Sequence, residues 1–246
     1  YIPQKYVTSL YGNKVYFSAS GLEQYARCPY KHFIHRALSP KERARYEMEE
    51  TDIGILVHGC IDEFTDFLKK HPELSEQWDE KRNQEEINAI FSQYADKMLG
   101  VSFEDNARNQ YLLRKIRKTT EETAKYVVRH LNLGTFKIWG QEVGFGYGKD
   151  YPAVELIEDT AYLRGRIDRV DVCHKDDKDY IKVIDYKTGK KTFHLSDAWQ
   201  GYDLQLLFYL YALLYSRAIG KDKVYPAGAF YFPAVYSLLS TEEENE

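Results

Sequence analysis

Three charged residues could together carry out hydrolytic chemistry: Asp168, Asp185 and Lys187. The polar run Lys175–Asp179 separates the first from the other two and is typical of a turn between β-strands. The sequence therefore predicts a β-hairpin with Asp168 on its first strand and Asp185 and Lys187 on its second. Two carboxylates can hold Mg²⁺, which activates a water, and a lysine can stabilise the charge that develops during phosphodiester hydrolysis.

The second strand of this hairpin is expected to place its charges at the edge of a core. Side chains alternate along a strand, so Ile181, Val183, Asp185 and Lys187 share one face, which begins apolar and ends charged. Burying an unpaired charge is costly, so these charges should pair with one another or with a metal ion, and Asp168 could share the site. The alternative is an exposed Asp–Lys pair on a surface hairpin, which contributes little to stability.

The composition fits a globular protein with one sizeable core, or a core with a helical appendage. The chain has 246 residues, 43% of them apolar and 29% charged. No apolar run reaches the roughly 18 residues of a membrane span, and no signal peptide opens the chain. Cys28, Cys60 and Cys173 are widely spaced and form no C-x-x-C pair, so we expect a reducing cytoplasm. The net charge of −4 argues against a general nucleic-acid coat protein but not against a nuclease with an acidic site. The start at Tyr1 suggests a fragment of a larger protein.

The first half of the chain carries mainly helical patterns. A capping box at Ser20–Glu23 predicts one helix, and Pro29 can begin a second segment that reaches Leu38. Longer helices are predicted at Asp52–Lys70, Glu85–Leu99 and about Arg108–Leu133. We expect a strand or an extended lead-in over residues 1–17 and an exposed connection over Pro40–Glu50.

Two features of the long helices could take part in function. His58 lies beside the apolar stripe of the first, with Gly54 one turn earlier, and could be a metal ligand, although a packed histidine is the commoner case. The third helix carries a basic cluster that could follow a DNA backbone or simply form a solvated face. Its members are Arg114, Lys115, Arg117 and Lys118.

The second half changes from helical to strand patterns after Gly134. The predicted strands are 136–145, 153–156, 161–173, 180–187 and 227–232, with a long helix from Ser196 to Gly220 before the last. This order predicts a single α/β domain in which one mixed sheet is flanked by helices and residues 72–133 form a helical insertion.

Five motifs occur in an order that resembles the PD-(D/E)XK nuclease superfamily. They are Ser18–Tyr30, Gly54–His58, Gly165–Arg169, Ile184–Gly189 and Gln205–Tyr209. Each is weak alone, but their order and spacing resemble the RecB-like branch and, within it, the C-terminal nuclease domains of the AddB type, from about Val15 to Pro233. The resemblance implies a restriction-endonuclease-like fold.

The resemblance also implies a role for each motif residue. A divalent ion, Mg²⁺ or Mn²⁺, would be bound by His58, Asp168, Asp185 and the backbone carbonyl of Tyr186. Lys187 would be the catalytic lysine, and Gln205 and Tyr209 would form a Q-x-x-x-Y motif. One helical turn separates these last two, which suits contacts to a phosphate or to the lysine, although Tyr209 could equally be a core residue.

The resemblance further implies partners and a possible second cofactor. Cys28 matches the first cysteine of an iron–sulfur site of many relatives, whose other ligands lie in a C-terminal cluster, so a cluster is expected only in a full-length parent; otherwise Cys28 is a small core residue. The implied activity is that of a DNA exonuclease in double-strand break repair, with a helicase–nuclease subunit of the AddA type as partner. The alternatives are an inactive scaffold that binds DNA or partner subunits, and a nuclease of another branch, such as a CRISPR-adaptation or phage-recombination exonuclease.

Overall fold

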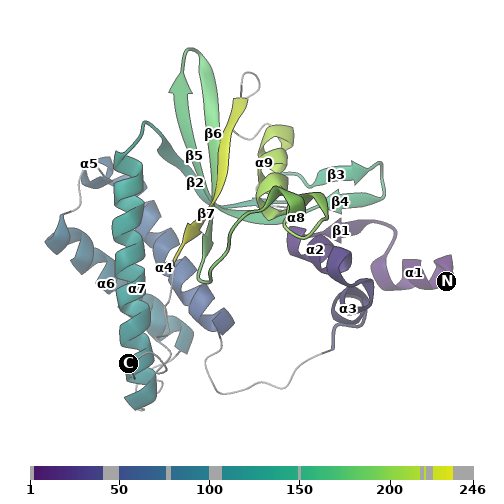
Figure 1. Ribbon diagram of the computed structural model, residues 1–246, viewed down its shortest axis with the longest axis horizontal. Coiled ribbons are helices and arrows are strands. Elements are labelled where there is room, and N and C mark those ends of the chain that lie inside the picture. The colour runs from purple at the N-terminus through teal and green to yellow at the C-terminus, as the bar shows by residue number, and fades with distance from the viewer. Residues whose placement is uncertain are drawn as a thin grey trace. The chain divides into compact units, whose positions relative to one another are not determined.

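The computed structural model places the chain in two compact units (Figure 1). It describes residues 3–40, 50–75, 79–99, 107–148, 151–216, 219 and 224–234. We call the two groups the sheet unit (Tyr1–Tyr46, Phe136–Asp185 and Thr192–Tyr231) and the helical unit (Glu47–Thr135, Tyr186–Lys191 and Phe232–Glu246). The connection predicted after Pro40 and the helix stop predicted at Gly220 lie outside the described residues.

A four-stranded sheet is the centre of the sheet unit. Its strands lie in the order β2 (Lys137–Phe145), β5 (Gly165–Lys175), β6 (Lys178–Lys187) and β7 (Val224–Pro233). The predicted hairpin is confirmed as β5 and β6, which pair antiparallel. Asp176 and Asp177, which both have positive φ, form the two-residue turn between them. Aspartate tolerates this backbone conformation better than most residues, which explains the polar run at this position.

A second, three-stranded sheet corrects the prediction of a single mixed sheet. It contains β1 (Val15–Phe17), β4 (Ala161–Leu163) and β3 (Val154–Ile157), with β4 in the middle, parallel to β1 and antiparallel to β3. The predicted strand over 161–173 is therefore two strands that break at Arg164, whose backbone N–H donates to the carbonyl of Phe17 at 2.8 Å. The alternating pattern continues across this break, so the sequence alone did not reveal it.

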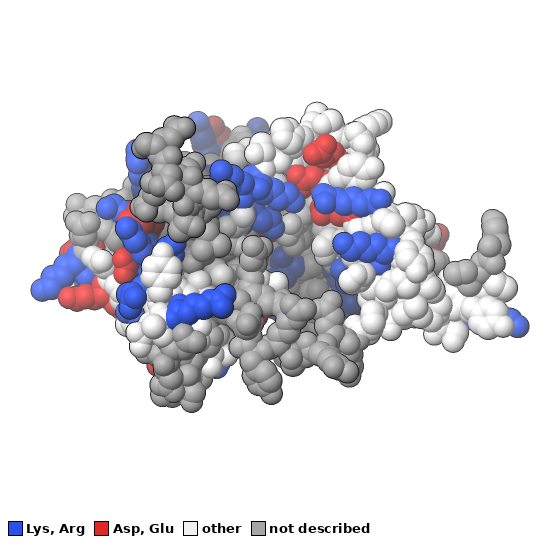
Figure 2. Space-filling model, turned by 60° about the horizontal axis from the view of Figure 1, so that its bottom comes forward, with Lys and Arg blue, Asp and Glu red and all other residues white. Residues whose placement is uncertain are grey.

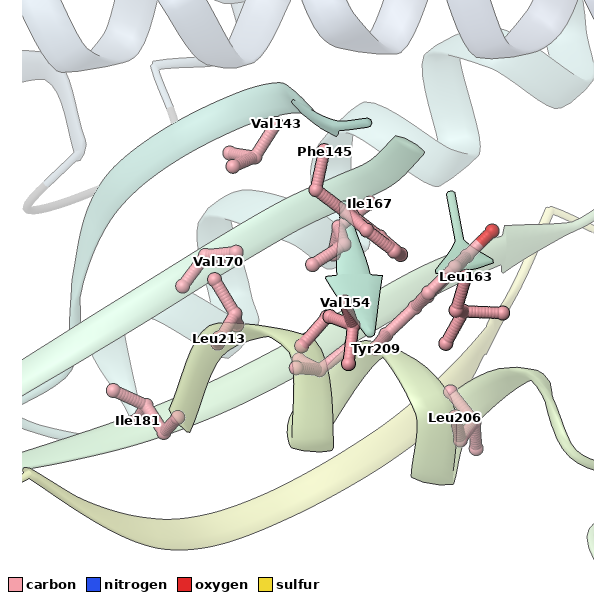
Figure 3. Close-up of a cluster of buried hydrophobic side chains, with 12 residues drawn as sticks. Val143, Phe145, Val154, Leu163, Ile167, Val170, Ile181, Leu206, Tyr209 and Leu213 are labelled. Atoms are coloured by element: carbon pink, nitrogen blue, oxygen red, sulfur yellow. The ribbon is translucent and has the colours of Figure 1, made fainter. Parts of the chain in front are cut away.

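The core of the sheet unit lies between the strands and α9 (Gln205–Ser216), as Figure 3 shows. Leu206, Tyr209 and Leu213 recur on the buried side of the helix and pack in this cluster with Val170 and Val183. The other buried members are Val143, Phe145, Val154, Leu163, Ile167, Ile181 and Ala212. Apolar residues at helical spacing opposite apolar residues at strand spacing thus fix α9 across one face of the sheet.

The helix predicted from Ser196 is also two elements. α8 (Leu195–Trp199) ends before Gly201, which has φ +82°, and α9 begins at Gln205. A residue with a left-handed backbone conformation cannot continue a right-handed α-helix, so the chain turns at Gly201 before α9 starts.

The strand or extended lead-in predicted for residues 1–17 is correct only for its end, because a helix comes first. α1 (Gln4–Tyr11) precedes β1, and α2 (Ala19–Arg27) follows it. Pro29 begins α3 (Pro29–His32) as predicted, and a π-helical turn, Phe33–Leu38, continues to the predicted end. The short length of β1, three residues, left no periodicity that the sequence could display.

The helical unit contains α4 (Glu50–Lys70), α5 (Pro72–Ser75), α6 (Glu80–Leu99) and α7 (Ala107–Asn132). The three long helices confirm the predicted ones, and α4 packs against both α6 and α7 (Figure 1). α6 begins five residues earlier than predicted because the Asp79 carboxylate accepts the backbone N–H groups of Lys81 and Arg82, both at 3.0 Å. No helix in the described ranges combines the length and apolar character needed to span a membrane.

The predicted basic cluster of α7 is partly used in packing. Arg117 donates to the Ser92 hydroxyl at 3.3 Å and lies over the Phe91 ring, and Lys115 lies over the Tyr111 ring. On the face seen in Figure 2, Lys and Arg side chains of the helical unit alternate with Asp and Glu. This arrangement favours the solvated-face interpretation over a continuous track for DNA.

Candidate active site

The hairpin register brings the two predicted carboxylates together. The recorded pairing of β5 with β6 ends with Arg169 opposite Ile184, so Asp168 and Asp185 are the next residues on the two neighbouring strands, and both carboxylates raise the pKa of the Tyr209 phenol. Asp185 is 1% exposed, so its charge is nearly removed from water. Two such carboxylates repel each other unless a proton or a cation lies between them.

Gln205 joins this carboxylate pair from α9. Its side-chain amide donates to Asp185 Oδ1 at 2.8 Å and to the Tyr209 hydroxyl at 3.0 Å. The two residues of the predicted Q-x-x-x-Y motif therefore act on each other and on a carboxylate. The contact to a phosphate or to the lysine that the spacing suggested stays a prediction.

Tyr209 is a core residue, as one of its two predictions has it, and it also accepts a hydrogen bond from Gln205. Its ring lies in the buried core, and its hydroxyl is linked through Gln205 to Asp185. Burial raises the pKa of its phenol well above the ordinary value, and the Asp185 and Asp168 carboxylates raise it further, whereas the hydrogen bond from Gln205 acts in the opposite direction. The phenol is therefore neutral at any physiological pH, and it keeps a proton with which it can donate a hydrogen bond.

Gly165, at the start of β5, allows α9 to approach this closely. A Cβ atom at this position would lie 2.7 Å from the Phe145 ring and 3.1 Å from the Tyr209 ring. The glycine that opens the Gly-Arg-Ile-Asp segment is thus needed because aromatic side chains occupy the space where its own side chain would lie.

Lys187 and His58 both belong to the helical unit. Lys187 is the last residue of β6, two residues after Asp185, and its carbonyl accepts the backbone N–H of Ala234 at 2.9 Å. The His58 ring lies edge-on to the Tyr186 ring, with centroids 5.9 Å apart. The structure thus places His58 against the residue that follows Asp185 in the chain, while its role as a metal ligand and that of the Tyr186 carbonyl stay predictions.

The donor set of the sheet unit suits a hard cation. Asp168 and Asp185 offer carboxylate oxygens, which Mg²⁺ and Mn²⁺ prefer. No group of three or more His, Cys, Asp or Glu side chains that could hold a metal occurs among the described residues. Backbone oxygen, water or substrate can supply further ligands, as is common for Mg²⁺, and the part of His58 as a ligand stays a prediction.

Cys28 has a structural position that the sequence did not suggest. It is half-buried between α2 and α3, and its sulfur accepts the backbone N–H of Lys31 at 3.5 Å, which caps α3. Its predicted role as an iron–sulfur ligand in a longer parent stays a prediction.

Glu23 is a functional residue whose position the sequence analysis misassigned. Its carboxylate accepts the backbone N–H groups of Leu204 at 2.8 Å and Gln205 at 3.2 Å, so it caps α9 rather than its own helix. The predicted capping box is wrong, because α2 starts at Ala19 and Ser18 accepts the backbone N–H of Gly21 at 3.1 Å. A carboxylate at the positive end of α9 is favourable, and it fixes the turn that carries Gln205.

Two further contacts hold the start of α9. Arg27, one turn after Glu23 on α2, donates to the carbonyl of Tyr202 at 2.9 Å. The hydroxyl of Tyr231 on β7 donates to Asp203, which is 4% exposed. Burial and the Asp203 carboxylate raise the pKa of Tyr231, so its hydroxyl remains a donor. The first turn of α9 is therefore fixed from α2 and from β7.

Several known proteins are similar to this chain over most of its length. A subunit of the ATP-dependent helicase/deoxyribonuclease of Caldanaerobacter subterraneus subsp. tengcongensis is 36% identical over 234 residues, which cover 94% of this chain and 20% of the relative. The corresponding subunit from Clostridium novyi is 34% identical over 234 residues, which cover 94% of this chain and 21% of the relative. The subunit from Alkaliphilus oremlandii is 34% identical over 253 residues, which cover 99% of this chain and 22% of the relative. The chain spans about a fifth of the length of these relatives.

The family is shown by a match that covers most of the chain. The sequence profile of the PD-(D/E)XK nuclease superfamily matches residues 16–242, which contain α2, the hairpin, α4 and α9. The mixed α/β architecture is consistent with the restriction-endonuclease-like fold of that superfamily. The chain belongs to the PD-(D/E)XK nuclease superfamily.

Proposed function

We propose that this chain is a Mg²⁺- or Mn²⁺-dependent DNA exonuclease domain. The observation that carries the proposal is the convergence of Asp168, Asp185, Gln205 and Tyr209 at the edge of a buried hairpin. Paired carboxylates of this kind suit a hard cation, and the family supplies the reaction class, phosphodiester hydrolysis.

Each residue has a distinct part in the proposed mechanism. Asp168 and Asp185 would hold the metal, with the Tyr186 carbonyl and His58 as further ligands. The metal would supply an activated water and neutralise charge on the scissile phosphate. Lys187 would stabilise the negative charge that develops on that phosphate. Gln205 holds Asp185 in one orientation through the 2.8 Å hydrogen bond, so the carboxylate need not reorganise during the reaction.

The similarity to helicase/deoxyribonuclease subunits extends the proposal to a biological setting. Because three such subunits are 34–36% identical to this chain, we propose that it is part of a helicase–nuclease that acts on DNA in double-strand break repair. An AddA-type helicase–nuclease subunit would be its partner, and a cytoplasmic location follows from the DNA substrate.

A cleavage assay tests the proposed activity. End-labelled linear DNA, single-stranded and duplex, is incubated with the purified chain in Mg²⁺, Mn²⁺ or EDTA. We expect cleavage from the ends in either metal and none in EDTA. Asp185→Asn should abolish cleavage, whereas Asp179→Asn, at the far end of the same strand, should leave it unchanged. A folded wild-type chain that binds DNA but never cuts it would favour the inactive scaffold instead.

A further inference from the structure

A row of alternating cationic and aromatic side chains crosses the small sheet of the sheet unit. The rings of Tyr16 and Tyr162 stack with centroids 5.3 Å apart and planes 23° apart. Lys14 lies over the Tyr162 ring at 5.4 Å. At the other end the guanidinium of Arg164 lies over Tyr16 at 5.8 Å and over Tyr147 at 5.5 Å. The row therefore runs Lys14, Tyr162, Tyr16, Arg164, Tyr147.

Two hollows adjoin this row, and both include Tyr16 and Arg164 in their walls. One, of about 390 Å³, is also lined by Lys14 and Arg36, and the other, of about 570 Å³, by Tyr147. None of the described residues that line either hollow is an Asp or a Glu. Lys14 is ion-paired with the exposed Asp159 at 3.6 Å, outside the walls, whereas Arg36 and Arg164 make the walls themselves cationic, and this suits an anionic ligand in a chain with a net charge of −4.

Two of the three tyrosines of the row are exposed, and the third, Tyr162, is partly buried. Tyr147 is 54% and Tyr16 is 43% exposed. The loop that carries Tyr147 reaches Arg164 through Gly146, where an added Cβ would lie 2.7 Å from the Arg164 Cβ. Gly146 and Gly148 both have positive φ, so glycine holds the loop in a shape that keeps Tyr147 outside.

We propose that this row, which we call the stacking surface, binds a single-stranded segment of nucleic acid. Flat exposed rings stack with unpaired bases of any sequence, and interleaved Lys and Arg contact the phosphates. An acidic peptide would use the cations but not the ring faces, and paired bases in a duplex would not reach the rings. The proposal rests on the proposed function for its ligand class and deepens it.

The position of Arg164 links the stacking surface to the carboxylates. Arg164 immediately precedes β5, and Asp168 follows four residues later on that strand. Four residues of strand extend roughly 13 Å, since a strand rises about 3.3 Å per residue. A single strand held on the stacking surface would thus lie within a few nucleotides of Asp168.

Fluorescence anisotropy of a labelled oligothymidine in EDTA tests the inference without cleavage. We expect Tyr147→Ala and Tyr16→Ala each to weaken binding by about fivefold or more. Replacing Lys14, Arg36 and Arg164 by Gln should lower the slope of log affinity against log salt by roughly 2, at about 0.7 per phosphate contact. As matched controls, Tyr111→Ala and Tyr126→Ala, whose rings are 51% and 55% exposed on α7, should bind like wild type.

The outcomes separate this inference from the proposed function. Asp185→Asn should bind oligothymidine like wild type although it cannot cut, and a blunt duplex should compete at least about tenfold more weakly. Equal losses in the control and test variants would overturn the inference, as would an oligoglutamate that displaces the DNA as well as unlabelled oligothymidine does. If Tyr16→Ala lowers the melting temperature, the inference is judged from the oligothymidine affinity of Tyr147→Ala alone, because Tyr147 lies in an exposed loop.

Discussion

Glu23 is expected to act on catalysis through α9, because it touches the backbone of Gln205 and no reacting group. Removing it in Glu23→Ala deletes two hydrogen bonds to the start of α9, of 2.8 and 3.2 Å. Loss of a helix cap costs about 1 kcal/mol, within a range of roughly 0.5–2. For a chain of this size that corresponds to a fall in melting temperature of about 2–4 °C.

The effect on turnover follows from the hydrogen bond between Gln205 and Asp185. A bond to a charged acceptor contributes about 1.5 kcal/mol, and losing it in the transition state lowers the rate about tenfold. We therefore expect Glu23→Ala to lower kcat about tenfold while KM changes little, because no substrate contact is removed.

The assay is steady-state cleavage of linear DNA well below the melting temperature. Glu23→Gln keeps an oxygen acceptor and should recover most of the rate, whereas Glu122→Ala, an exposed acid on α7, should have no effect. A Glu23→Ala variant with wild-type kcat, or a Gln variant no better than the Ala variant, would refute the positioning role.

The remaining predictions concern the lysine, the buried tyrosine and a buried ion pair. Lys187→Ala should remove cleavage and leave the melting temperature close to that of wild type, since Lys187 is the last residue of its strand; normal cutting by this variant would contradict its role. Because burial raises the pKa of Tyr209, its phenol is neutral throughout the assay range, so Tyr209→Phe should slow cleavage by the same factor at pH 7 and pH 9; a ratio that changes with pH would show that the phenol titrates. Asp171→Asn should destabilise the chain by about 3–5 kcal/mol in urea, because Arg169 donates to both Asp171 oxygens at 2.8 Å and both side chains are fully buried; a loss below about 1 kcal/mol would mean that water reaches the pair.

The hairpin and the long helices could be predicted because their signals are local. The β5–β6 hairpin is marked by alternating apolar residues on both sides of a polar turn, and α4 by an apolar stripe at helical spacing. The same pattern predicts that Asp168 lies one strand away from Asp185 and could share its site, since the turn joins their two strands.

The missed features depend on partners that are distant in sequence. Glu23 matched a local capping pattern, but its hydrogen-bond partners lie about 180 residues later, at Leu204 and Gln205. The strand over 161–173 changes sheets at Arg164 without interrupting its alternation. Charged residues are usually exposed to water, but Arg169 and Asp171 are both buried because the charge of each side chain is neutralised by the other.

The central claim is that Asp168 and Asp185 together hold a divalent cation. Its most direct test is an anomalous difference map from crystals of the chain soaked in Mn²⁺. We predict a peak at ordinary metal–oxygen distance from a carboxylate oxygen of each residue, and its loss in Asp185→Asn crystals. Mn²⁺ bound elsewhere, with the two carboxylates turned away from each other, would contradict the claim.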